Sequence, residues 1–169
     1  MRALTAFALV LAFASAASAE TPVERGKYLA TISGCKDCHT PGGMLGAPDE
    51  KRWLGGSDVG FGDPASGVWI GGNLTPDPET GLGKWTTDEI VTSFTKGKRP
   101  DGRELSQIMP WPALSKLTPD DARAIALYLQ SLPPVKNAIP GPYKAGETPA
   151  VPYVSAVIPT AQYMGLPQP

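Results

Sequence analysis

The residues of this chain best suited to chemistry lie together in the heptapeptide GCKDCHT, which begins at Gly34. It contains both cysteines of the chain and its only histidine. The two residues between Cys35 and Cys38 give a spacing that suits a metal ion, a redox-active disulfide or a covalently attached cofactor. Spacing alone does not choose among these, so the surrounding sequence must decide.

Cys-x-x-Cys-His is the attachment pattern of haem c. Two thiols at this spacing can add to the two vinyl groups on one edge of a porphyrin, and the next residue then lies under the iron. The sequence therefore predicts thioether links from Cys35 and Cys38 and axial ligation by His39. We also expect a backbone carbonyl between Pro41 and Pro48 to accept the His39 ring N–H and fix its tautomer.

Three other interpretations of the motif compete. A structural disulfide leaves His39 without a role. A thioredoxin-type motif follows a strand of a βαβ unit, whereas a helix is predicted immediately before Gly34. A structural zinc site takes four ligands, and two cysteines with one histidine leave it one short.

The second axial ligand cannot be histidine, so methionine, lysine, water or an open position remains. Met44 is too close to His39 along the chain to reach the opposite face of a macrocycle, and Met164 lies in a proline-rich segment. Met109 follows a long excursion of chain and is held by Pro110, so we expect it to be the sixth ligand. The alternative is an ordinary core methionine. A thioether ligand raises the reduction potential, which suits electron transfer.

Four further side chains are candidate cofactor contacts through hydrogen bonds to the haem propionates. All four are polar or carry an N–H donor, and residues of these types are also common at surfaces and in packing. They are Asn73, Trp85, Arg99 and Arg103.

Three helices are predicted from their capping sequences. Thr21 and Thr86 are each followed three residues later by Glu, and Thr118 precedes a proline and two acidic residues. The expected ranges are 22–33, 87–96 and 119–132, with one extra turn over 112–116.

The first and last of these helices are expected to cross. Gly26 permits a close approach, and Tyr28 and Leu29 are predicted to pack against an apolar stripe of the last helix. That stripe consists of Ile125, Tyr128 and Leu129.

The remaining chain is rich in turns, with 19 glycines and 19 prolines. A long glycine-rich loop from Pro41 to Lys84 is expected to wrap something or to carry function, and Gly67 to Ile70 predicts a short strand, which allows a small hairpin. From Pro134 onward the chain is proline-rich without helical period, which predicts an extended tail.

The N-terminus reads as a secretion signal. Arg2 precedes an apolar run from Ala3 to Ala14, and cleavage is expected near Ala19. The run is shorter than a bilayer requires, so no transmembrane anchor is expected in the mature chain. We predict a signal peptide over 1–19, one domain over 20–135 and a tail over 136–169, in the periplasm, an oxidising compartment. The formal net charge of −1 argues against a nucleic-acid partner.

These features together resemble class I c-type cytochromes. Three stretches between Val23 and Val135 are similar, more narrowly, to the haem domains of cytochrome c subunits of bacterial periplasmic dehydrogenases for alcohols, aldehydes and gluconate. They are RGKYLATISGCKDCHT, GGNLTPDPETGLGKWTTDEI and GKRPDGRELSQIMPWPALSKLTPDDARAIALYLQSLPPV.

The resemblance implies a mainly α fold with crossing terminal helices, a short middle helix and one covalent haem c between His39 and Met109. The segment from Asn73 to Trp85 would lie beside the propionates. It implies an electron carrier rather than an enzyme, which takes electrons from a dehydrogenase catalytic subunit and passes them to a downstream cytochrome or oxidase. The alternative is a haem enzyme or gas sensor with an open distal position. Those subunits commonly chain three haem domains and end in a membrane-binding tail, whereas this chain has one haem motif.

Overall fold

The computed structural model describes residues 19–156, so the predicted signal peptide up to Ser18 and the last part of the predicted tail lie outside the described residues. None of the helices in 19–156 combines the length and apolarity needed to span a bilayer. In chain order the elements are α1 (Pro22–Ile32), α2 (Cys35–His39), the 3-10 turns η1 (Gly43–Leu45) and η2 (Glu50–Arg52), β1 (Gly60–Asp63), β2 (Gly67–Ile70), α3 (Thr87–Lys96), α4 (Trp111–Leu114), α5 (Pro119–Ser131) and β3 (Tyr153–Val154).

The three predicted helices are confirmed, and their capping residues act as expected. In α1 the Thr21 hydroxyl accepts the Glu24 N–H, while the Glu24 carboxylate accepts the Thr21 N–H at 2.8 Å. The same reciprocal pair begins α3 at Thr86, and Thr118 caps α5. Gly97 ends α3 with a φ of 67°, a left-handed conformation that glycine adopts without steric cost.

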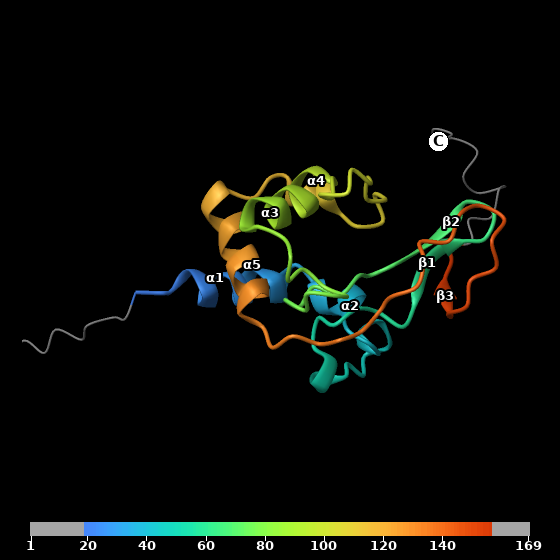
Figure 1. The fold of residues 1–169 in the computed structure, drawn as a ribbon, viewed down its shortest axis with the longest axis horizontal. Helices are drawn as coiled ribbons and strands as arrows, with labels where there is room; N and C mark the ends of the chain where they lie inside the picture. Colours follow the sequence, from blue (N-terminus) through green and yellow to red (C-terminus); the bar gives the residue numbers. More distant parts are fainter. Residues whose placement is uncertain (1–18, 157–169) are drawn as a thin grey trace, which may run out of the picture.

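The terminal helices α1 and α5 cross closely, as Figure 1 shows. A Cβ on Gly26 would overlap the Ala124 carbonyl oxygen, so glycine is required at the crossing. Leu29 is buried in the interface, as predicted. The prediction for Tyr28 is wrong, because this side chain is 53% exposed. The buried positions of α1 follow a three- to four-residue spacing that Tyr28 misses, and its ring instead lies under the Arg25 guanidinium, 5.8 Å from the centroid.

The hydrophobic core joins the helices to the long loop. Ile90 and Phe94 of α3 meet the inner face of α5, and Leu54 and Leu82 of the loop complete the buried cluster. The loop is therefore anchored in the core at two places, which allows it to support side chains elsewhere along its length.

A small three-stranded sheet lies on the side of the molecule away from α1 and α5 (Figure 1). Strands β1 and β2 form an antiparallel hairpin, with β2 at the predicted positions, and β3 pairs in parallel with β1. The sequence allowed a hairpin here, which the structure has, but the positions of β1 and the presence of β3 were not predicted. The β1 sequence GFGD has two glycines, and β3 has only two residues, so neither shows the alternation that predicts a strand.

The segment after α5 is extended but bonded to the domain along its described length. Tyr143 exchanges two backbone hydrogen bonds with Val68, at 2.9 and 3.0 Å, and Pro152 accepts the Gly60 N–H. In Figure 1 the orange chain that leaves α5 runs past α2 to the sheet. Proline richness predicted extension here, but it gave no signal for these long-range bonds.

The close crossing of α1 and α5 predicts an unusual response to Gly26→Ala. This change in a helix ordinarily stabilises by about 0.5–1 kcal/mol. Here the added methyl overlaps the α5 backbone, so we expect the free energy of unfolding to fall by roughly 1–3 kcal/mol. Urea unfolding measures the change. The exposed neighbour gives the control Lys27→Ala, expected within roughly 0.5 kcal/mol of the parent; a stabilised Gly26→Ala variant would contradict the crossing.

Candidate functional site

The Cys-x-x-Cys-His residues form a one-turn helix of their own, α2. Gly34 turns the chain out of α1 with a φ of 68°, and the Asp37 N–H then bonds to the Gly34 carbonyl at 3.0 Å. Helical spacing places Cys35, Cys38 and His39 at positions i, i+3 and i+4, which share one face. Local geometry thus brings two sulfurs and an imidazole to one side of a single turn.

Both cysteines are free and partly buried. Burial raises the pKa of the Cys35 thiol to about 11, and the Cys38 pKa is raised by burial and by the neighbouring Asp37 carboxylate. Reactive redox cysteines have the opposite shift, a lowered pKa that favours the thiolate. At neutral pH the pair is therefore a set of neutral thiols rather than a poised redox couple.

His39 is held by a hydrogen bond from its ring. Its side chain is buried, and Nδ1 lies 2.7 Å from the carbonyl oxygen of Gly72. Burial lowers the His39 pKa, and the Gly72 bond opposes this in part, so the ring is neutral at pH 7. Because a carbonyl only accepts, Nδ1 carries the proton and Nε2 keeps its lone pair.

The free ring nitrogen of His39 remains accessible. Within residues 19–156, every fully buried side-chain nitrogen has a hydrogen-bond partner. Nε2 has none among these residues. Nε2 is therefore not fully buried, and its lone pair is available to a ligand. A neutral imidazole in this state is a good ligand for a transition metal.

The acceptor for the His39 ring was predicted between Pro41 and Pro48, and this is wrong. That segment folds on itself, with the Pro41 carbonyl accepting the Asp49 N–H. The glycine pair after β2 approaches α2 instead, since a Cβ on Gly71 would overlap the Cys38 carbonyl oxygen. Two consecutive glycines directly after a predicted strand were the signal for a close backbone approach.

Met109 lies in a closed loop between α3 and α4. The Leu105 N–H bonds to the Gly97 carbonyl at 2.7 Å, and the Trp111 ring packs where Gly97 has no side chain. In the view of Figure 1, this loop and α4 lie above α2. Cys35 and Met109 each pack against the apolar core cluster.

Trp85 and Arg99 are brought together, because the Arg99 guanidinium stacks over the Trp85 ring at 4.8 Å from its centroid. Trp85 also packs against the core cluster, and its indole N–H has no acceptor within residues 19–156. Arg103 lies across a tight turn, where its carbonyl accepts the Arg99 N–H. Burial and the Arg99 charge lower the Arg103 pKa. Trp85, Arg99 and Arg103, which we call the cationic cluster, thus lie close together, and Asp101 of the same turn accepts a bond from Arg99 Nε at 3.3 Å.

Asn73 does not join this cluster. Its Nδ2 donates to the Val135 carbonyl at 2.6 Å and to the Thr80 hydroxyl at 3.1 Å, and its Oδ1 accepts two bonds from Thr75. Both N–H groups are engaged within the protein, so in this arrangement the side chain has none left for a propionate. Asn73 therefore has a structural role within the loop in this structure, and its contact with a propionate stays a prediction.

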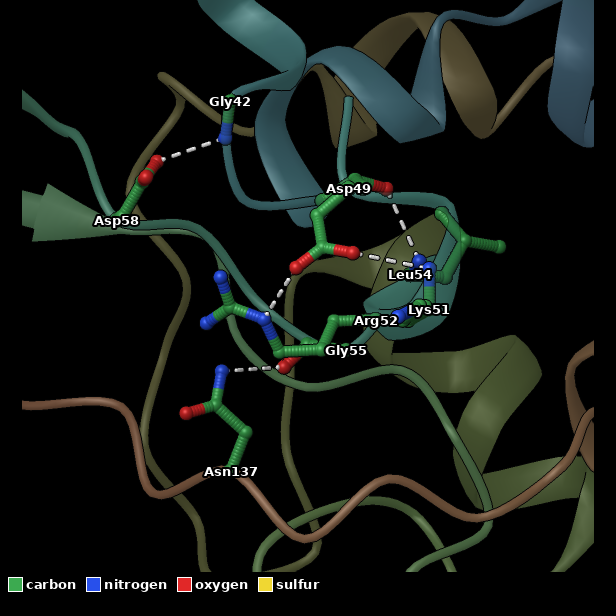
Figure 2. A network of polar contacts seen from close by, with 9 residues as sticks. Gly42, Asp49, Lys51, Arg52, Leu54, Gly55, Asp58 and Asn137 are labelled. Atoms are coloured by element: carbon green, nitrogen blue, oxygen red, sulfur yellow. Dashed lines mark hydrogen bonds and ion pairs between the residues drawn. The ribbon is translucent and has the colours of Figure 1, made fainter. Parts of the chain in front are cut away.

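The loop behind His39 is tied to α2 by buried hydrogen bonds. The Thr40 hydroxyl accepts the Leu54 N–H at 3.0 Å, where Leu54 has a φ of 55°. The Gly56 N–H donates to the His39 carbonyl at 2.8 Å. Figure 2 shows how Asp49 organises the preceding turn by accepting the Lys51 N–H and the Arg52 Nε.

The residues present fit a covalently attached haem. Two neutral thiols and an imidazole lone pair share one helical face, Cys35 and Met109 each pack against the apolar core, and the cationic cluster suits carboxylates. Within residues 19–156, no group of three or more His, Cys, Asp or Glu side chains is placed to hold a metal ion directly.

Comparisons with known proteins agree with this donor set. The family model described as cytochrome c matches residues 23–133. The cytochrome c subunit of the quinone alcohol dehydrogenase of Gluconacetobacter polyoxogenes is 37% identical over 128 residues, covering 73% of this chain and 27% of the relative. The corresponding subunit from Gluconobacter oxydans (strain 621H) is 34% identical over 117 residues, covering 69% of this chain and 23% of the relative.

A third relative belongs to a different dehydrogenase. The gluconate 2-dehydrogenase cytochrome c subunit of Pantoea cypripedii is 30% identical over 117 residues, covering 69% of this chain and 24% of the relative. The chain thus spans about a quarter of the length of the three relatives, at 23%, 27% and 24%.

The buried bond behind α2 predicts the effect of Thr40→Val. The variant keeps the side-chain shape but leaves the buried Leu54 N–H without its acceptor, so we expect a loss of about 1–3 kcal/mol in unfolding free energy. Thermal unfolding followed by circular dichroism measures the loss. Thr31→Val is the matched control, because the Thr31 hydroxyl is exposed and bonds only to the backbone of its own helix. Equal losses in the two variants would show that the Thr40 bond is not special.

Proposed function

This chain belongs to the cytochrome c family, and on that premise we propose that it is an electron-transfer protein carrying one covalently bound haem c. The observation that carries the proposal is the arrangement on α2. Cys35, Cys38 and His39 share one face, and the Gly72 carbonyl fixes the imidazole with its Nε2 lone pair free. A single Cys-x-x-Cys-His motif supports a single haem.

We assign the site residues as follows. The Cys35 and Cys38 sulfurs would tether the cofactor, and His39 Nε2 and the Met109 sulfur would ligate its iron. When bound, the haem supplies a one-electron ferric–ferrous couple, which a thioether ligand shifts toward the ferrous form. If His39 and Met109 both held the iron, no coordination site would be left for a substrate, which suits a carrier rather than an enzyme.

The cationic cluster of Trp85, Arg99 and Arg103 is our candidate site for the haem propionates. The Trp85 indole has a free N–H, and Arg99 stacked on its ring offers further donors. Arginine binds carboxylates through paired hydrogen bonds, so this cluster matches the acidic edge of a haem. Asn73 would act indirectly, because its hydrogen bond to Val135 fixes the loop that contains Gly72.

The names of the relatives support a dehydrogenase as the electron donor. They are cytochrome c subunits of dehydrogenases for alcohol and gluconate, and we propose that this chain likewise accepts electrons from the catalytic subunit of a dehydrogenase. A downstream cytochrome or oxidase would then take them. We further propose a signal peptide over 1–19 with export to the periplasm, a haem domain over 20–135 and a tail over 136–169.

Mass spectrometry of the exported protein tests the attachment. We expect the denatured wild-type polypeptide to carry the added mass of one haem, because thioether bonds survive unfolding. The double variant Cys35→Ala and Cys38→Ala should carry none, whereas Lys36→Ala, altered between the two cysteines, should carry the full amount. A wild-type chain with no added macrocycle, or with two, would overturn the proposal.

Carbon monoxide tests the distal ligand. Ferrous wild-type protein is expected not to bind the gas, since Met109 occupies the position, and Met109→Ala should bind it readily, with a shifted Soret band. Met44→Ala is the matched control, because Met44 is 36% exposed and lies in η1 of the long glycine-rich loop. This variant should behave as the wild type. Prompt binding by the wild type would favour the alternative of an open-site haem enzyme or gas sensor.

A further inference from the structure

His39 is held at two points, by its ring and by its backbone. The ring Nδ1 donates to Gly72, and the His39 carbonyl accepts the Gly56 N–H at 2.8 Å. These partners belong to two loop segments, 54–57 and 71–75, that are bonded to each other. The Ser57 N–H donates to Gly71 and the Leu74 N–H to the Leu54 carbonyl, both at 2.8 Å. The position of the imidazole therefore depends on how firmly this segment pair is fixed.

The chain that leaves α5 crosses both segments. On the 71–75 side, the Val135 carbonyl accepts Asn73 Nδ2 at 2.6 Å, and the Val135 N–H donates to the Thr75 hydroxyl at 3.0 Å. On the 54–57 side, Asn137 Nδ2 donates to the Gly55 carbonyl at 2.8 Å, as Figure 2 shows. Residues 135–139, which we call the strap, thus join the two segments from the outside.

Packing reinforces these bonds. The Ile139 side chain occupies the space beside Gly56, where a Cβ would overlap it, and Val135 Cγ1 lies 3.0 Å from where a Cβ on Gly55 would stand. Gly56 is the residue whose N–H holds the His39 carbonyl. The strap therefore touches the residue that binds the His39 backbone and, through Asn73, the neighbour of the residue that binds its ring.

The Asn73 amide makes the connection stiff. It is 4% exposed and makes four bonds, two donated by Nδ2 and two accepted by Oδ1. An amide engaged at both ends cannot turn without leaving a buried polar group unpaired. Movement of Val135 would thus be transmitted to the Gly72–Asn73 backbone.

We propose that the strap is a positioning element for His39, which sets the strength of the Nδ1–H to Gly72 hydrogen bond and thereby the reduction potential of the bound haem. A firm hydrogen bond from Nδ1–H makes Nε2 a stronger electron-pair donor to the iron, which favours the ferric state. Loosening the strap weakens that bond and shifts the couple toward the ferrous form. This inference rests on the proposed function of the chain as a haem c carrier.

Asn137→Ala tests the strap, with Lys136→Ala as the matched control. The first removes the side-chain bond to Gly55, while the second removes an exposed ion pair to Glu79 from the neighbouring residue. We expect Asn137→Ala to shift the electron-exchange equilibrium with a redox dye about threefold toward the reduced protein, the size expected for loss of one supporting hydrogen bond. Lys136→Ala should leave it unchanged, and Asn137→Gln, which keeps the donor, should restore part of the shift.

Hydrogen exchange at the Gly56 amide gives a second readout that does not depend on redox activity. Exchange should be faster in Asn137→Ala than in the wild type or in Lys136→Ala. Should Asn137→Ala fail to accumulate, Ile139→Val removes only the methyl nearest Gly56 and is judged on the same two measurements.

Two results would contradict the proposed role of the strap in positioning His39. One is a lowered unfolding midpoint in Asn137→Ala with unchanged potential and unchanged Gly56 exchange, which means a purely structural role. The other is an equal potential shift in Lys136→Ala, which means a general effect of surface charge. A wild-type protein without covalent haem would instead refute the proposed function, and Gly56 exchange would then decide alone whether the strap holds the loop.

Discussion

The structure depends on one short hydrogen bond between a buried imidazole and a backbone carbonyl, from His39 Nδ1 to Gly72 at 2.7 Å. It selects the tautomer and leaves the other nitrogen as the lone-pair donor. The bond requires two distant stretches of backbone to approach more closely than a side chain at residue 71 allows, because a Cβ on Gly71 would overlap the Cys38 carbonyl oxygen. Much of the long loop can be understood as a means of holding this carbonyl in place.

Chemistry and stability are supplied by different parts of the chain. The crossing of α1 and α5 and the packing of α3 form most of the apolar core, and α2 is attached to α1 through Gly34. The site residues gather where the helical core meets the loop. This division lets the loop be rich in glycine and polar bonds, because burial of apolar surface occurs mainly in the helices.

What the sequence predicted well was local. Capping residues fixed the starts of α1, α3 and α5, and the spacing of Cys35, Cys38 and His39 indicated the site directly. What it did not predict was long-range: the Gly72 acceptor, the bonds of Asn73 to Val135, and the pairing of β1 with β3. Each of these joins segments that are distant along the chain through backbone groups, and a backbone group has the same chemistry at every residue. The error for Tyr28 is local: it precedes the buried Leu29 in the sequence, and its aromatic character alone does not show that its side chain faces away from α5.

The parallel pairing of β3 with β1 has a consequence for solubility. Strand β1 lies in the middle of the sheet only because β3 covers its outer side. A hairpin without that cover would present a row of unsatisfied amides and carbonyls, the kind of edge on which a second polypeptide can add a strand and start aggregation. With β3 in place, the edge on the β1 side is a strand of 2 residues, too short to template such growth, and on the other edge Tyr143 pairs with Val68 of β2.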